Sequence, residues 1–223
     1  MAALRDAYRR DLQHVHDQVV IMGSMVDKAI DRSIVALQQL DFAAAREIIE
    51  DDQVVNRARF QVEEQAIRLI ATQQPIASDL RAIIAILNIV VDLERIGDYA
   101  VGNARIVLMH EDKPLLKPLI DIPRMAERAR GMLRRALDAF IVRDVAAAMA
   151  IAREDDEVDA LYDQVYRELL TFMLSDPTTI DRATWLLWVA HNLERSADRV
   201  TNICERIVYE ATGRMEEVGA SNF

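Results

Sequence analysis

The chain has few of the residues that interrupt helices or build disulfide frameworks. Its 223 residues include 6 glycines, 5 prolines and 1 cysteine, and aromatic residues make up only 5%. The single cysteine, Cys204, excludes an intrachain disulfide, and its helical surroundings predict a small buried side chain rather than a nucleophile. Hydrophobic residues nevertheless make up 52% of the chain, mostly Ala, Leu, Ile and Val. This composition favours long helices around a sizeable core over sheets.

Long apolar runs and basic clusters are also missing. The run 83–91 is interrupted by Asn88 and is far shorter than the roughly 20 residues that a membrane-spanning helix needs. The first residues contain no apolar segment typical of a signal peptide, so we expect a cytoplasmic protein without membrane insertion. The formal net charge of −10 disfavours nucleic acid and suits a cation. Motifs of nucleotide-binding, nucleophilic or zinc-dependent enzymes are absent, so we do not expect an enzyme.

Prolines and turn residues divide the chain into segments with a helical apolar period. Leu80, Ile84, Leu87 and Val91, for example, follow one another at steps of four and three. The pattern predicts an all-α fold. The six expected helices cover residues 5–38, 42–72, 77–110, 120–142, 145–174 and 178–211.

The six expected helices are two copies of a three-helix unit. The motif Leu-Glu-Arg-x-x-Asp occurs at 93–98 and again at 193–198, and Pro75 recurs as Pro177. Such spacing predicts two tandem three-helix bundles related by internal duplication. The expected divisions are a first repeat at 1–112, a Pro-rich linker at 113–123, a second repeat at 124–212 and a flexible tail at 213–223.

Four polar pairs stand out because their members are four residues apart and therefore lie on one helix face. Three of the pairs carry like charges, which destabilise a helix unless a partner compensates them. The pairs are Asp52/Asn56, Glu94/Asp98, Asp155/Asp159 and Glu194/Asp198.

The pairs lie at matching distances from the two turns. Asp52 is 23 residues before Pro75 and Asp98 is 23 residues after it. A short turn makes neighbouring helices antiparallel, so Asp52 is expected opposite Asp98. The second copy repeats this arrangement around Pro177 to within one residue.

The acidic pairs have two interpretations. The apolar stripe of the third helix continues into Glu94 and Asp98, and a carboxylate on a packing face is costly unless it is paired or binds a metal. Oxygen ligands suit Mg, Ca, Mn or Fe better than Cu. Alternatively, the acids form salt-bridge seams with neighbouring arginines. The candidates are Arg57, Arg59, Arg95, Arg105 and Arg195, of which Arg95 and Arg195 are expected to meet another helix.

The roles of several other residues near the motifs have two interpretations each. His191, three residues before Glu194, is either an ordinary partly exposed side chain or a ligand. Gly97 serves either tight helix packing or the close approach of a ligand. Trp185 and Trp188 belong either to the core or to a partner surface.

At these motifs the sequence resembles the PhoU family of phosphate-transport accessory proteins, over residues 5–211. The segments that carry the resemblance are 22–26 (Met-Gly-x-Met-Val), 74–81 (Gln-Pro-x-Ala-Ser-Asp-Leu-Arg), 93–98 (Leu-Glu-Arg-Ile-Gly-Asp), 153–159 (Arg-Glu-Asp-x-x-Val-Asp) and 192–205. The second repeat departs from the pattern with Ser196 and Ala197 in place of Ile-Gly, and Asn56 is a weaker ligand than a carboxylate.

The resemblance implies metal clusters (Fe, Mn, Zn, Mg or Ca) on the four pairs. It also implies a negative regulator that links the ATPase subunit of the phosphate ABC transporter to the phosphate-sensing histidine kinase, and we expect a homodimer. Two alternatives are a His-poor carboxylate metalloenzyme and a metal-free helical adaptor.

Overall fold

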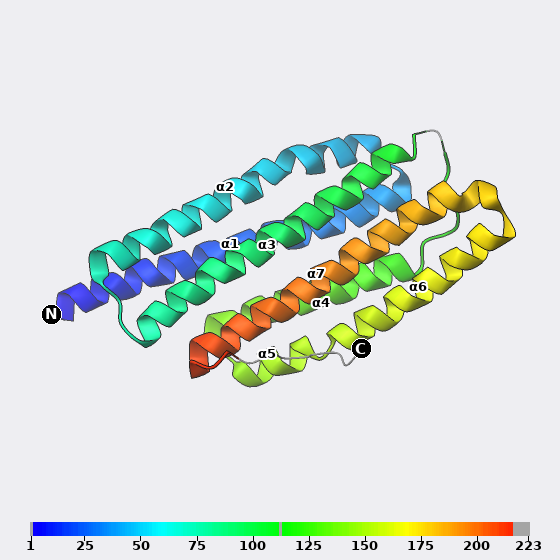
Figure 1. Cartoon of the computed structure of the whole chain (residues 1–223). Helices are drawn as coiled ribbons and strands as arrows, with labels where there is room; N and C mark the ends of the chain where they lie inside the picture. Colours follow the sequence, from blue (N-terminus) through cyan, green and yellow to red (C-terminus); the bar gives the residue numbers. More distant parts are fainter. Residues whose placement is uncertain (1, 112, 216–223) are drawn as a thin grey trace.

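A computed structural model of the chain describes residues 2–111 and 113–215 (Figure 1). The first half consists of α1 (Ala2–Gln39), α2 (Phe42–Gln73) and α3 (Ser78–Met109). The second half consists of α4 (Asp121–Val142), α5 (Val145–Ala152), α6 (Asp155–Ser175), a 3₁₀ turn η1 (Pro177–Thr179) and α7 (Ile180–Thr212). The predicted all-α class and the duplicated three-helix arrangement are confirmed.

The two halves begin their second helix in the same way. The side chain of Asp41 accepts hydrogen bonds from the backbone amides of Ala43 and Ala44, at 3.0 and 2.9 Å. In the second half the side chain of Asp144 accepts one from the amide of Ala147 at 3.0 Å. These aspartates satisfy amides that have no partner inside the helix, and they fix where the second helix of each half starts.

One expected helix is interrupted. The segment 145–174 divides into α5 and α6 at Arg153 and Glu154. Two turns here are closed by short-range bonds, from Glu154 N to Ile151 O and from Glu157 N to Glu154 O. The buried residues on either side keep the apolar pattern, which is why the pattern predicts a continuous helix.

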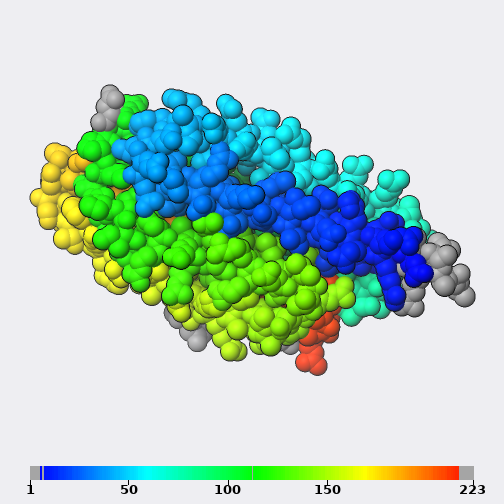
Figure 2. Space-filling view, turned by 180° about the vertical axis from the view of Figure 1, so that it is seen from behind, coloured from blue at the N-terminus to red at the C-terminus, as the bar shows by residue number. Residues whose placement is uncertain are grey.

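The helices run side by side along an elongated body. In Figure 1, α2, α3, α7 and α6 lie in that order across the near face. The reverse view in Figure 2 shows α1 (blue) and α4 (green) next to each other. α3 packs against α7, and α1 packs against α4, so the two halves share one continuous core.

The segments outside the helices differ in how closely they follow the prediction. The Pro-rich linker expected at 113–123 includes the first turn of α4, and its leucines 115, 116 and 119 pack against the core. Gly213 ends α7 in the left-handed conformation with φ of 76°. The predicted flexible tail lies beyond it, and its residues 216–223 are outside the described part of the chain, as are Met1 and Asp112. Among the described helices, none combines the length and apolar character needed to cross a bilayer.

Candidate functional site

The first acidic cluster lies between α2 and α3, in the middle of the first half. Asn56 donates a hydrogen bond from Nδ2 to Oδ2 of Asp52 at 2.7 Å. Burial, together with the nearby charge of Asp98, raises the pKa of Asp52, while Asn56 and Arg105 oppose this rise. The proximity of Asp52 and Asp98 agrees with the antiparallel register predicted from Pro75.

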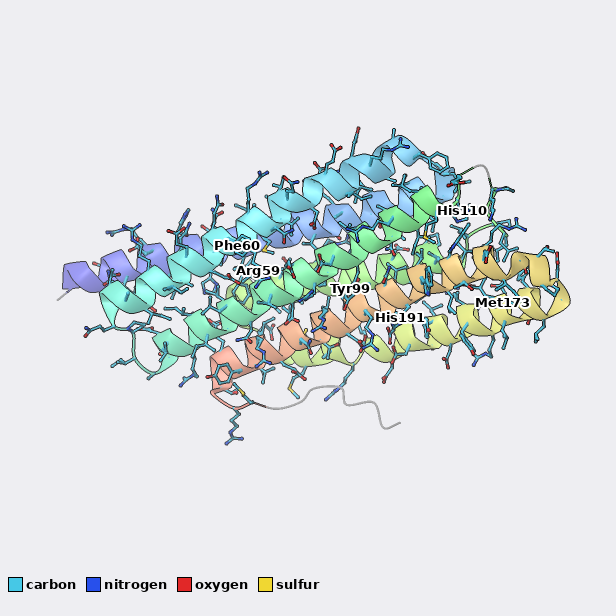
Figure 3. All side chains as sticks on the ribbon, turned by 45° about the horizontal axis from the view of Figure 1, so that its top comes forward. Arg59, Phe60, Tyr99, His110, Met173 and His191 are labelled. Atoms are coloured by element: carbon cyan, nitrogen blue, oxygen red, sulfur yellow. The ribbon has the colours of Figure 1, made fainter. Side chains whose placement is uncertain are left out.

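An arginine from the facing helix neutralises the same cluster. Arg59 on α2, labelled in Figure 3, is the residue in question. It donates to Glu94 at 3.1 Å and to Glu63 at 2.7 Å. Arg95 on α3 bonds to Asp98 at 3.2 Å, along its own helix. The Nε atom of Arg95 also lies 3.7 Å from Oε2 of Glu94, so Glu94 has a positive neighbour on both helices.

The expectation that Arg95 and Arg195 meet another helix is wrong. Arg195 bonds to Asp198 at 2.7 Å, just as Arg95 bonds to Asp98. Both side chains are long enough to extend along their own helix to the acid three residues later. That acid lies on the same side of the helix.

The second cluster brings four carboxylates together between α6 and α7. Burial raises the pKa of Asp155 to about 7, and Asp198, Asp159 and Glu194 reinforce this rise. Burial and the charge of Asp198 likewise raise the pKa of Glu194 to about 7, although Arg195 opposes it. The pKa of Asp159 is raised for the same two reasons. The predicted residues of the second half are therefore close enough to repel one another.

Each cluster contains carboxylate oxygens that have no hydrogen-bond partner among the described residues. In the first cluster these are Oδ1 of Asp52 and Oε2 of Glu94, and in the second they are Oδ1 of Asp155 and Oε2 of Glu194. Buried polar atoms are rarely left this way, and hard cations prefer oxygen ligands. The donors thus fit a hard metal ion. In the described residues, however, no three His, Cys, Asp or Glu side chains converge closely enough to hold one as they stand.

The two clusters differ at one equivalent position. Arg59 of α2 corresponds to Tyr162 of α6, 103 residues later. The position therefore supplies a positive charge to Glu94 in the first half and an uncharged ring beside Glu194 in the second. The strongly raised pKa values occur in the second cluster, where this positive charge is missing.

A cavity of about 230 Å³ adjoins the first cluster. Asp52 and Gly97 line it together with residues of α1. A Cβ atom at Gly97 would lie 3.4 Å from Val55, which is an ordinary packing distance. A methyl group at position 97 would therefore fit, and close helix packing does not require a glycine here.

The other candidates from the sequence have distinct surroundings. His191 is exposed, and its Nδ1 lies 3.4 Å from Oε2 of Glu194. Cys204 is buried, and burial raises the pKa of its thiol to about 12, as expected for an unreactive side chain. Trp185 is buried against His110, whereas Trp188 is about half exposed.

Sequence reasoning missed a polar seam where α3 meets α7. Asp92, buried on α3, accepts hydrogen bonds from Arg199 and Asn202 of α7, both at 3.4 Å. Asn192 of α7 donates to Asn103 of α3 at 2.9 Å. Asp92 and Asn192 are equivalent positions, 100 residues apart. The sequence signal that could have revealed the seam is the presence of a polar residue at this position in both repeats.

The fold and these sites define a class of protein: a tandem repeat of helical bundles with one acidic cluster in each half. The family model described as "PhoU domain" matches residues 19–107 and 122–207. The chain belongs to the PhoU family.

Individual relatives match over nearly the whole chain. The phosphate-specific transport system accessory protein PhoU homolog of Clostridium acetobutylicum is 36% identical, over 96% of this chain and 98% of the relative. The PhoU accessory protein of Escherichia coli K12 is 35% identical, over 93% and 86% respectively. The prediction that this chain is not an enzyme agrees with the accessory role in these names.

Solved structures support the same assignment. The phosphate transport system regulatory protein PhoU from Streptococcus pneumoniae superimposes with a TM-score of 0.87 at 31% identity, over 94% of this chain and 99% of that one. PhoU from Pseudomonas aeruginosa gives a TM-score of 0.88 at 34% identity, over 93% and 100%.

Proposed function

We propose that this chain is a cytoplasmic, metal-binding regulator of phosphate uptake and phosphate-starvation signalling. In this role it acts by binding, as a negative regulator that links the ATPase subunit of a phosphate transporter to a phosphate-sensing histidine kinase. Family membership and the names of the relatives support the transport role. Self-association as a homodimer is part of the proposal.

The metal part of the proposal depends on one observation. Both halves contain buried carboxylate oxygens without hydrogen-bond partners among the described residues. A Fe, Mn, Zn, Mg or Ca ion would take these oxygens as ligands and add positive charge to each cluster. The residues that would hold it are Asp52, Asn56, Glu94 and Asp98 in the first half, and Asp155, Asp159, Glu194 and Asp198 in the second.

Metal binding at the second cluster requires a small rearrangement. Arg195 now bonds to Asp198 and lies 3.4 Å from Oε2 of Glu194. Because its side chain is about half exposed, Arg195 can turn into solvent and release both acids. The carboxylates can then turn toward a common ion.

The test is the metal content of protein purified without chelator. We expect Asp155→Asn combined with Glu194→Gln to lose the metal of the second cluster, roughly half of the total, by elemental analysis. The matched control is Asp163→Asn combined with Asp181→Asn, which removes two exposed acids of α6 and α7 outside the cluster. Equal metal content in the two double variants would show that the cluster is not the site.

The ion pairs of the arginines favour a second candidate, a metal-free helical adaptor. Arg59, Arg95 and Arg195 all contact cluster acids. A metal bound only by the folded state must raise its melting temperature. Identical melting curves with and without chelator would therefore support the adaptor.

The partner links are tested in cells grown with abundant phosphate. We expect affinity-purified, cross-linked protein to recover the transporter ATPase subunit and the histidine kinase. Recovery of neither protein would contradict the proposed link. Sedimentation of the purified chain tests the homodimer.

A further inference from the structure

Aromatic side chains gather on the outer edge of α6 and α7, beside the second acidic cluster. This aromatic patch consists of Tyr162 and Tyr166 on α6 and Trp188 and His191 on α7. The rings of Tyr162 and His191 lie 6.1 Å apart, and Figure 3 shows His191 where α7 runs alongside α6. Tyr166 and Trp188 lie 11 residues before and after Pro177, so they sit at the same height on antiparallel helices.

The patch is exposed, and apolar residues extend it. Tyr166 is 44% and Trp188 48% exposed. Leu170 and Leu174 follow Tyr166 along α6 at successive steps of four, and both are exposed as well. Large apolar side chains that line up on a surface in this way are typical of interaction sites.

The helical bundle itself does not require the patch. The positions equivalent to its four members in the first half are Arg59, Glu63, Asn88 and Val91. There, Arg59 and Glu63 form an ion pair, so the same scaffold folds with a polar edge. The aromatic residues therefore belong to the surface of the second half and not to the shared architecture.

The surroundings of the patch are acidic. Helix α6 carries six acidic residues and one basic residue, and two of the acids pair with a basic residue of α4 and of the segment before it. That basic residue, Arg167, is paired with Asp163, and Arg195 on α7 is paired with Asp198 and Glu194. Aromatic faces bordered by carboxylates attract Arg and Lys side chains through both the ring and the charge.

We propose that the aromatic patch binds a basic, amphipathic helical segment of a partner protein. Its Arg or Lys side chains lie over Trp188 and Tyr166, and its apolar side chains contact Leu170 and Leu174. A second copy of this chain fits poorly, because two α6 helices would oppose acid to acid and the chain carries a formal charge of −10. The inference relies on the proposed function only in expecting a protein partner.

The test places a photo-cross-linker at the patch. The full chain carries p-benzoylphenylalanine at position 188 in cells, and mass spectrometry identifies the cross-linked peptide. The control carries it at position 60, because Phe60 is an exposed aromatic residue of the first half. We expect adducts at position 188, and not at 60, with a segment rich in Arg and Lys.

The identified segment is then synthesised, labelled and titrated with purified protein. We expect Trp188→Ser to weaken binding roughly tenfold or more, as for an interface anchor, and Phe60→Ser to leave it unchanged. Unchanged binding of Trp188→Ser would overturn the proposal. Adducts with a second copy of the chain, or with an acidic segment, would also overturn it. The same holds if position 188 gives no adducts beyond those seen at position 60. Metal content is measured on the same Trp188→Ser protein, so a failed metal site is distinguished from a failed partner surface.

Discussion

Arg59 and Tyr162 show how one substitution between repeats changes an acidic cluster. Arg59 reaches across from α2 to Glu94, whereas Tyr162 places an uncharged ring near Glu194. A guanidinium beside a carboxylate stabilises its charge and competes with a bound cation. The carboxylates of the second cluster are therefore less compensated by protein cations than those of the first.

Exchanging these two residues is expected to exchange the affinities of the clusters. Arg59→Tyr removes the charge beside Glu94 and strengthens cation binding at the first cluster, while Tyr162→Arg weakens it at the second, each by roughly tenfold. Titration with Mn²⁺ followed by electron paramagnetic resonance measures both. The control Arg57→Tyr changes an exposed arginine of α2. The explanation fails if Arg59→Tyr and Arg57→Tyr bind Mn²⁺ equally.

The raised pKa values of Asp155 and Glu194 predict a pH dependence of stability in metal-free protein. Both pKa values rise to about 7 in the folded state, above those in the unfolded chain. The folded state then holds protons that the unfolded state has released, so the free energy of unfolding falls as pH rises from about 4 to about 7. Urea denaturation with chelator at pH 5, 6 and 7 should show this loss.

The carboxylates of the second cluster can be identified as its source by substitution. Asp155→Asn should give a clearly flatter dependence between pH 5 and 7, because the amide does not titrate. Asp163→Asn, on the exposed side of the same helix, should keep the dependence of the unaltered chain. Equal slopes for both variants would place the effect elsewhere.

At the scale of helices, two glycines occupy opposite environments. A Cβ atom at Gly23 of α1 would lie 2.3 Å from a methyl group of Leu137 on α4. At Gly131 of α4 the nearest atom is the end of Arg135, at 4.0 Å. Gly23 thus allows α1 and α4 to approach closely, while Gly131 has open space around it.

These environments predict changes of opposite sign. Gly23→Val should lower the free energy of unfolding by about 1–3 kcal/mol, because the added methyl groups overpack the contact with Leu137. Gly131→Ala should raise it by about 0.5–1 kcal/mol, because alanine favours the helix and meets no close neighbour. Urea denaturation of both variants measures the difference. A stabilising Gly23→Val would contradict the close α1–α4 contact.

Sequence reasoning predicted the helices well because each has a sustained apolar period and a marked end. The position of Pro75 also predicted that Asp52 lies near Asp98. The direction of Arg95 was not predictable, because a long side chain can turn along its own helix or across to another. Likewise, the break at Arg153 leaves the apolar pattern intact, so no signal marked it.

At the scale of the whole molecule, the two halves are one folding unit. α3 and α7 are buried against each other, and two sets of hydrogen bonds cross the seam. Asp92 accepts from Asn202, and Asn192 donates to Asn103. Separating the halves would expose this apolar core to water and break the hydrogen bonds between Asp92 and α7. Sequence repeats predicted two bundles but not their mutual packing, because contacts between repeats leave no periodic signal within either one.

A single cooperative unfolding transition is therefore expected. In calorimetry of metal-free protein, the measured enthalpy should equal the van't Hoff enthalpy, as for a two-state process. Two resolved transitions, or a measured enthalpy about twice the van't Hoff value, would mean that the halves unfold separately.

The seam between α3 and α7 also makes the halves non-interchangeable. If the first half paired with a copy of itself, Asp92 would meet Tyr99 and Gly102 in place of Arg199 and Asn202, their equivalents 100 residues later. A self-paired second half would bring Asn192 against Asn202, where Gly102 now leaves room. The chain therefore behaves as a heterodimer whose two subunits are covalently joined. Each half has diverged so that its seam residues fit the other half and not a second copy of itself.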